Sequence, residues 1–124
     1  MTTYVRVIDG DGEEYLTTRK ELSDEIVAMQ DEGFDAEITI VKEADTIEKL
    51  CDGYHVVNGI ASFSSGDIYD SLKDAKDFAD DLNSYCDRKG INYKGRIVLY
   101  AFIATDKGLI YVAKMNEKGE LELI

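Results

Sequence analysis

The segment between Gly66 and Gly90 has the most regular spacing of apolar residues in the chain. They recur at steps of three and four, which return to the same side of an α-helix. These residues are Ile68, Leu72, Ala75, Ala79, Leu82 and Cys86. Basic residues and a glycine follow at the end, where they suit the negative pole of a helix and its left-handed cap. The pattern predicts a helix from about Asp67 to Arg88 with one buried side.

Acidic residues follow the same rhythm on the other side of this predicted helix. They are Asp67, Asp70, Asp74, Asp77 and Asp81. At about 100° per residue they share a sector of about 80°, and about 5 Å separates neighbours along the axis. This separation is comparable with that of phosphates along a nucleic-acid strand. Exposed helix sides usually mix charges, so the stripe predicts a surface for a basic partner. A merely solvated face remains the alternative interpretation.

The chain's charge narrows the classes of partner. Its 124 residues include 26 acidic and 14 basic side chains, a formal net charge of −12. Nucleic acids and anionic membranes are disfavoured because both need basic residues to neutralise phosphates. Basic proteins and cations are attracted by such a field, although the charge also serves solubility. A hydrophobic content of 44% is enough for a core, and the length predicts one domain, residues 1–124.

The first half of the chain predicts alternating strands and helices. Strands Thr3–Ile8 and Glu14–Thr17 flank an Asp-Gly turn and form a hairpin. Thr18 and Glu21 carry a capping signature for a helix that ends near Glu32, before Gly33. The next predictions are a strand at 36–41, a short helix from about 45 to 51, and two extended pieces within 54–63.

The last third predicts a β-meander. Residues 96–104, RIVLYAFIA, are apolar at nearly every position, which is typical of a central strand covered on both faces. Strands at 109–115 and 121–124 follow, each after a turn that ends in glycine. The predicted fold is α+β: a mostly antiparallel sheet from the N-terminal hairpin and the C-terminal three-strand meander, with two main helices packed on one face.

Metal sites fail on ligand spacing. Residues 9–14, DGDGEE, resemble a calcium loop, but the sixth and twelfth positions of an EF-hand loop fall on Glu14 and Lys20. Cys51, His55 and Cys86 are zinc-ligand types without the close pairs of a structural zinc site. We therefore expect neither metal nor cofactor.

Catalysis has little support in the sequence. His55 is the one histidine, and its apolar neighbours predict a strand position at the edge of the core. No catalytic constellation accompanies it, so the protein is not expected to be an enzyme. Two cysteines without CxxC spacing, no signal-like N-terminus and no apolar run of about 20 residues favour a cytoplasmic protein. The oligomeric state stays open.

Two function hypotheses remain. The first is a small acidic interaction protein that inhibits or modulates a basic, nucleic-acid-binding protein through the aspartate stripe, with Asp31, Glu32 and Asp35 as possible additions. In charge and size the chain is similar to small acidic proteins of phages and mobile elements that mimic nucleic acid. The second is a ligand-binding or regulatory module with a pocket between sheet and helices. Its candidate liners are Tyr54, Tyr69, Tyr93 and Tyr100.

Overall fold

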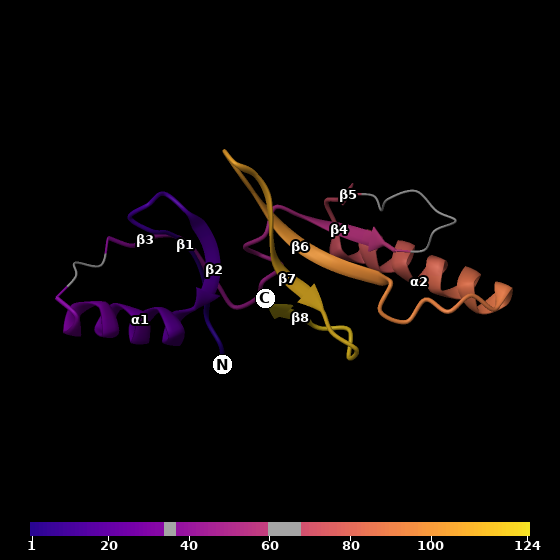
Figure 1. The fold of residues 1–124 in the computed structure, drawn as a ribbon, viewed down its shortest axis with the longest axis horizontal. Helices are drawn as coiled ribbons and strands as arrows, with labels where there is room; N and C mark the ends of the chain where they lie inside the picture. Colours follow the sequence, from indigo (N-terminus) through magenta and orange to yellow (C-terminus); the bar gives the residue numbers. More distant parts are fainter. Residues whose placement is uncertain (34–36, 60–67) are drawn as a thin grey trace. The chain divides into compact units, whose positions relative to one another are not determined.

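The computed structural model describes residues 1–33, 37–59 and 68–124. The chain divides into two compact units, formed mostly by Met1–Leu50 and by Cys51–Glu122. Each unit has one main helix and its own antiparallel sheet (Figure 1), so the α+β class is confirmed. The hairpin and the meander do not share one sheet, and the two helices do not share one face. A single domain over residues 1–124 stays a prediction.

The first unit is built on the predicted hairpin. Strands β1 (Tyr4–Ile8) and β2 (Glu14–Thr18) pair antiparallel, and β3 (Thr39–Ala44) pairs with β1, in the order β2-β1-β3. In the hairpin turn, the Asp9 carboxylate accepts the backbone N–H groups of two later turn residues. Gly12 has φ +82°, a left-handed conformation that glycine adopts without steric cost.

Helix α1 (Arg19–Asp31) begins and ends close to the predicted residues. The Thr18 hydroxyl caps it by accepting the backbone N–H of Glu21 at 3.2 Å. The Glu21 carboxylate accepts the hydroxyl of Thr17, whereas in a full capping box it would accept the Thr18 N–H. Leu22 joins a buried cluster with Val5 and Val7 of β1, so α1 packs on one face of the three-stranded sheet.

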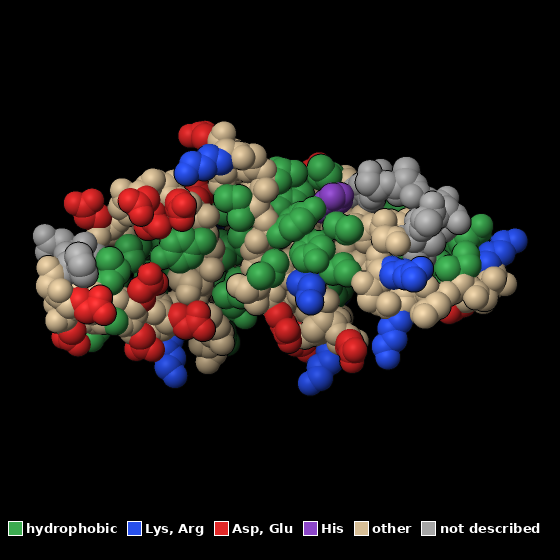
Figure 2. Space-filling model, in the orientation of Figure 1, with side chains coloured by type: hydrophobic (Ala, Val, Ile, Leu, Met, Phe, Trp, Pro, Cys, Tyr) green, Lys and Arg blue, Asp and Glu red, His purple; other side chains and the backbone are tan. Residues whose placement is uncertain are grey.

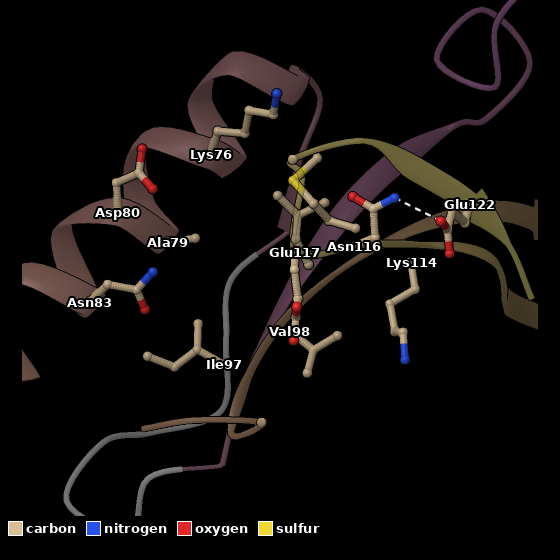
Figure 3. Close-up of a pocket in the computed structure, with 14 residues that line it drawn as sticks. Lys76, Ala79, Asp80, Asn83, Ile97, Val98, Lys114, Asn116, Glu117 and Glu122 are labelled. Carbon is tan, nitrogen blue, oxygen red and sulfur yellow. Dashed lines mark hydrogen bonds between the residues drawn. The ribbon is translucent and has the colours of Figure 1, made fainter. Parts of the chain in front are cut away.

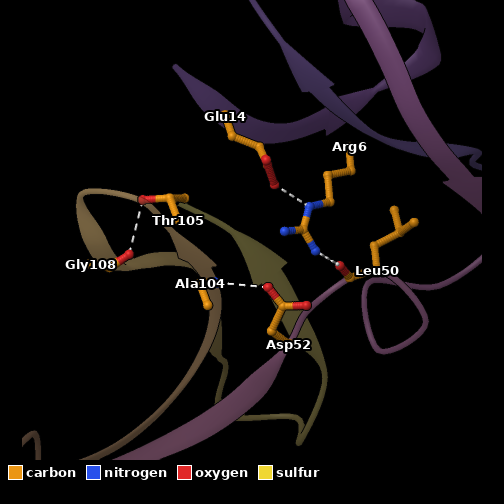
Figure 4. A network of polar contacts seen from close by, with 7 residues as sticks. All are labelled: Arg6, Glu14, Leu50, Asp52, Ala104, Thr105 and Gly108. Atoms are coloured by element: carbon orange, nitrogen blue, oxygen red, sulfur yellow. Dashed lines mark hydrogen bonds and ion pairs between the residues drawn. The ribbon is translucent and has the colours of Figure 1, made fainter. Parts of the chain in front are cut away.

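The predicted short helix after β3 is a turn. Leu50 N–H donates to the Ile47 carbonyl at 2.9 Å, and both side chains are buried. The Arg6 guanidinium donates to the Leu50 carbonyl and also pairs with Glu14 (Figure 4). The buried apolar side chains thus hold this segment as a turn, without a helical hydrogen-bond ladder.

The second unit contains a five-stranded sheet in the order β5-β4-β6-β7-β8. Its strands are β4 (Gly53–Asn58), β5 (Ile68–Tyr69), β6 (Ile97–Thr105), β7 (Gly108–Met115) and β8 (Leu121–Leu123). The meander and the central position of β6 are as predicted. The Asp52 carboxylate, just before β4, accepts the Ala104 N–H near the end of β6 at 2.7 Å (Figure 4).

Helix α2 (Leu72–Lys89) lies along one face of this sheet (Figure 1). Its buried residues are Ala75, Leu82 and Cys86. The strand side chains on the same face are equally buried, among them Tyr54, Val56, Leu99 and Ala101. Tyr69 of β5 also points to this face, with its ring 5.5 Å from that of Phe78. Helix α2 therefore covers this face of β6, and Phe102, on the opposite face, is only 5% exposed. The prediction that β6 is covered on both faces stays a prediction.

The start of α2 corrects the sequence prediction. The helix begins at Leu72, because Ile68 and Tyr69 pair with β4 as a short strand. Ser71 is the N-cap, and its hydroxyl accepts the Asp74 N–H at 3.4 Å. Ile68 was expected on the buried side of the helix and is instead 55% exposed. The predicted start at Asp67 and the extended piece after Gly59 lie outside the described residues.

The end of α2 matches the prediction. Gly90 has φ +67°, and its N–H returns to the carbonyls of the last helical turn. Arg88 and Lys89 place positive charge at the negative pole of the helix. Among the described residues, no helix combines the length and the apolar character needed to span a membrane.

Candidate functional site

Three of the five predicted stripe residues lie together on the outer side of α2. Asp74, Asp77 and Asp81 are exposed. The steps of three and four residues place them about 4.5 and 6 Å apart along the axis, within a narrow sector. The buried side of the helix points the opposite way, into the sheet. The sequence therefore located this part of the stripe correctly.

The other two predicted positions are not part of the helix. Asp70 is exposed, but it lies in the bend between β5 and the Ser71 cap. Its side chain is therefore not held by the helical repeat. Asp67 lies outside the described residues, as does Asp35, one of the proposed additions. The stripe on α2 is thus shorter than predicted.

Two of the three stripe aspartates on α2 interact with their local surroundings. Asp74 lies in the first turn of α2, where the positive pole of the helix stabilises its carboxylate. Asp77 lies 3.7 Å from the Lys73 ammonium, and their side chains are 63% and 85% exposed. An exposed pair of this kind contributes little to stability, so water and a partner compete for it easily.

Charge is unevenly divided between the two units. Residues 1–50 hold 14 of the 26 acidic residues and five of the 14 basic ones, a formal net charge of −9. Residues 51–124 hold 12 acidic and nine basic residues, a net charge of −3. Figure 2 shows acidic side chains spread over the visible surface of the first unit. The stripe on α2 is therefore a local feature of the less acidic unit.

Acidic groups gather at the hairpin end of the first unit. Burial, together with the nearby carboxylates of Glu25 and Asp9, raises the pKa of the Tyr15 hydroxyl. A shallow hollow of about 320 Å³ beside it is lined by residues that include Asp9, Asp11, Glu25 and Glu37. No described group of three or more acidic, histidine or cysteine residues is arranged to hold a metal ion. The Asp9 carboxylate is engaged in the turn, as the hairpin interpretation required.

The two cysteines among the candidate zinc ligands belong to the second unit. Cys86 is completely buried, and neither cysteine forms a disulfide. Burial raises the pKa of the Cys51 thiol, while a hydrogen bond with Tyr54 acts in the opposite direction. A raised thiol pKa lowers the thiolate fraction at neutral pH and makes Cys51 a poor nucleophile.

His55 lies in a cluster of aromatic rings. Its Nδ1 is 2.5 Å from the hydroxyl of Tyr111, and their ring centroids are 5.8 Å apart. The rings of Tyr100 and Tyr111 stack at 4.4 Å. The sequence placed His55 correctly in a strand, but the aromatic cluster was missed because the pairing of β4, β6 and β7 brings it together. That the protein is not an enzyme stays a prediction.

A cavity of about 610 Å³ lies between α2 and the sheet of the second unit (Figure 3). Apolar side chains from the strands, including Ile97, Leu99 and Met115, form part of its wall. Charged and polar groups from both sides complete it; they are Lys76, Asp80, Asn83, Lys114, Asn116, Glu117 and Glu122. None of the four predicted tyrosines lines this cavity. The predicted ligand-binding module with a pocket lined by these tyrosines stays a prediction.

Comparisons with known proteins assign the chain to no family. No family model matches it, and neither a curated protein nor a solved structure matches it.

Proposed function

We propose that this protein is a small acidic interaction protein, which inhibits or modulates a basic, nucleic-acid-binding protein through the outer side of α2. The observation that carries the proposal is the exposed row of Asp74, Asp77 and Asp81 on a helix that is anchored on its opposite side. A partner would supply arginine and lysine side chains of the kind that normally contact phosphates.

The support for α2 comes from its packing and its ends. Three buried residues on one side, the Ser71 cap and the Gly90 cap fix the helix. Carboxylates on a fixed helix lose less conformational entropy on binding than carboxylates on a mobile segment. The loose ion pair of Asp77 with Lys73 costs little to open. These features make the row a pre-formed surface for a basic partner.

The experiment compares two triple variants with the same change in charge. One changes Asp74, Asp77 and Asp81 to asparagine. The control changes Asp11 and Asp24 to asparagine and Glu13 to glutamine, all exposed residues of the first unit. The wild-type chain first captures its basic partner from a lysate of the encoding organism, and the Kd is then titrated at several salt concentrations.

We expect the α2 variant to raise the Kd at least about tenfold, which corresponds to about 1.4 kcal/mol. The control variant should stay close to wild type, and wild-type binding should weaken as salt increases. An equal loss in both variants would assign binding to overall charge, and an unchanged Kd in the α2 variant would reject the proposal. Circular dichroism checks that both variants are folded.

The cavity of the second unit supports a second candidate, a ligand-binding module. Its volume of about 610 Å³ falls within the usual range for small-molecule sites, and its wall mixes apolar surface with both signs of charge. A ligand that carries both an anionic and a cationic group suits Lys76 and Lys114 on the one hand and Asp80 and Glu122 on the other. Thermal-shift screening with amino acids and small zwitterions tests this. A true ligand should lose its effect in Ala79→Phe, which fills the cavity, and keep it in the α2 triple variant.

A further inference from the structure

The face of the five-stranded sheet that α2 leaves uncovered is unusually apolar. Strand pairing places His55 opposite both Ile68 and Tyr100 on this face, and Tyr111 follows on β7. Ile68 is 55% exposed, Leu109 50% and Tyr111 39%. An antiparallel sheet with one solvated face normally shows polar residues there. Figure 2 shows the hydrophobic side chains gathered over β6 and β7 on the visible face of this unit.

The same strands carry no carboxylate. No aspartate or glutamate occurs in β4, β5, β6 or β7, although 26 of the 124 residues are acidic. The one charged side chain in these strands is Lys114, near the end of β7. The unit that holds them has a net charge of −3, against −9 for the other. Two copies of the chain can therefore meet through these four strands without bringing their carboxylates together. The fifth strand, β8, carries Glu122 at the edge of the sheet.

Charge disfavours the other occupants of this face. A basic partner would find its complement on the acidic surfaces, not on strands that lack carboxylates. Nucleic acid, which stacks its bases on aromatic rings in some sheet proteins, would meet one lysine and a chain of net charge −12. A second copy brings an identical apolar face, and a two-fold axis would set the same rings against each other.

We propose that this aromatic face, built around His55, Tyr100 and Tyr111, is the interface of a weak homodimer. At usual strand spacing and rise, the faces of β4, β6 and β7 together measure about 360 Å². This is less than the roughly 800 Å² per partner of a standard interface. The dimer therefore forms at high concentration. It strengthens as salt increases, because screening reduces repulsion between two chains of net charge −12.

Sedimentation equilibrium of the full chain, from about 5 µM to 1 mM in 50 and 500 mM NaCl, tests the proposal. We expect a wild-type dimer with a Kd of roughly 10–100 µM at high salt and a weaker one at low salt. Tyr111→Lys and Leu109→Lys should each raise the Kd at least about tenfold, because they place charge in the interface. The matched control is Val27→Lys, which alters a 56% exposed apolar residue of α1.

The controls separate the face from general effects. Each lysine variant reduces the net negative charge of the chain, so a change in overall repulsion alone would strengthen the dimer. Leu109 lies outside the aromatic cluster, so its variant keeps the test valid if Tyr111→Lys fails to fold. A wild-type chain that stays monomeric at 1 mM in 500 mM NaCl would overturn the proposal and leave the face to a different protein. Dimerisation that both face variants retain, or that Val27→Lys loses equally, would also overturn it.

Discussion

The two helices both carry exposed carboxylates, but they differ in how many buried side chains hold them against their sheets. Helix α1 has 13 residues and buries one of them, Leu22, whereas α2 has 18 and buries Ala75, Leu82 and Cys86. Most helical stability in proteins comes from such packing and not from intrinsic propensity. The helix that carries the acidic residues of α1 is thus anchored by one buried side chain, whereas α2 is anchored by three.

The charges at the C-terminal ends of the two helices also favour α2 over α1. Helix α1 has no basic residue in its last turn and ends at Asp31 and Glu32, next to the negative pole of the helix. Helix α2 ends with Arg88 and Lys89, which the same pole attracts. We therefore expect the more acidic unit to have the less stable helix, so that high charge alone does not make a fixed binding surface.

The largest expected effect in this comparison comes from removing one leucine from each helix. Leu22→Ala and Leu82→Ala should each lower the free energy of unfolding by about 2–5 kcal/mol. Leu22→Ala should also release α1 locally, because its one fully buried side chain is lost. Urea unfolding gives the energies, and amide hydrogen exchange reports each helix separately. Equal protection of α1 in Leu22→Ala and α2 in Leu82→Ala would contradict the difference between the helices.

A smaller effect is expected from glycines that neighbour side chains in each unit. A Cβ on Gly53 would lie 2.6 Å from Cζ of the buried Phe102 ring, so the ring must move. Gly53→Ala should cost about 1–3 kcal/mol. A Cβ on Gly10 would lie 3.3 Å from side-chain atoms of the exposed Glu37, which has room to shift. Gly10→Ala should therefore stay within about 0.5 kcal/mol of wild type. Equal losses in urea unfolding would show that packing at Gly53 is not tighter.

Local signals in the sequence predicted the local elements well. The hairpin turn at Asp9–Gly12, the Thr18 cap and the Gly90 cap each depend on a few neighbouring residues, and the structure has all three. The start of α2 was misplaced because Ile68 fits the helical rhythm as well as a strand. Ile68 lies in a strand because it pairs with His55 of β4, and no local sequence pattern indicates that pairing.

Long-range pairing also decided what the sequence could not predict about the site. The shared outer side of Asp74, Asp77 and Asp81 on α2 could be predicted because a helix repeats locally. The ring cluster of His55, Tyr100 and Tyr111 joins three strands, so it required the register of the sheet. The division into two sheets was missed for the same reason, since each strand pattern is compatible with either partner.

The smallest effect concerns the charges at the helix ends, and it separates the helix dipole from general charge. Asp31→Lys should stabilise the chain by about 0.3–1 kcal/mol, and Arg88→Glu should destabilise it by a similar amount. Asp24→Lys is the control, because it makes the same charge change within α1, away from its C-terminal end. All three are compared by urea unfolding at low salt and in 1 M NaCl, where the screening length falls to about 3 Å. If Asp24→Lys stabilised the chain as much as Asp31→Lys, relief of the −9 charge of residues 1–50 would explain the gain. A larger gain for Asp31→Lys that disappears in 1 M NaCl would instead identify the uncompensated end of α1 as the source.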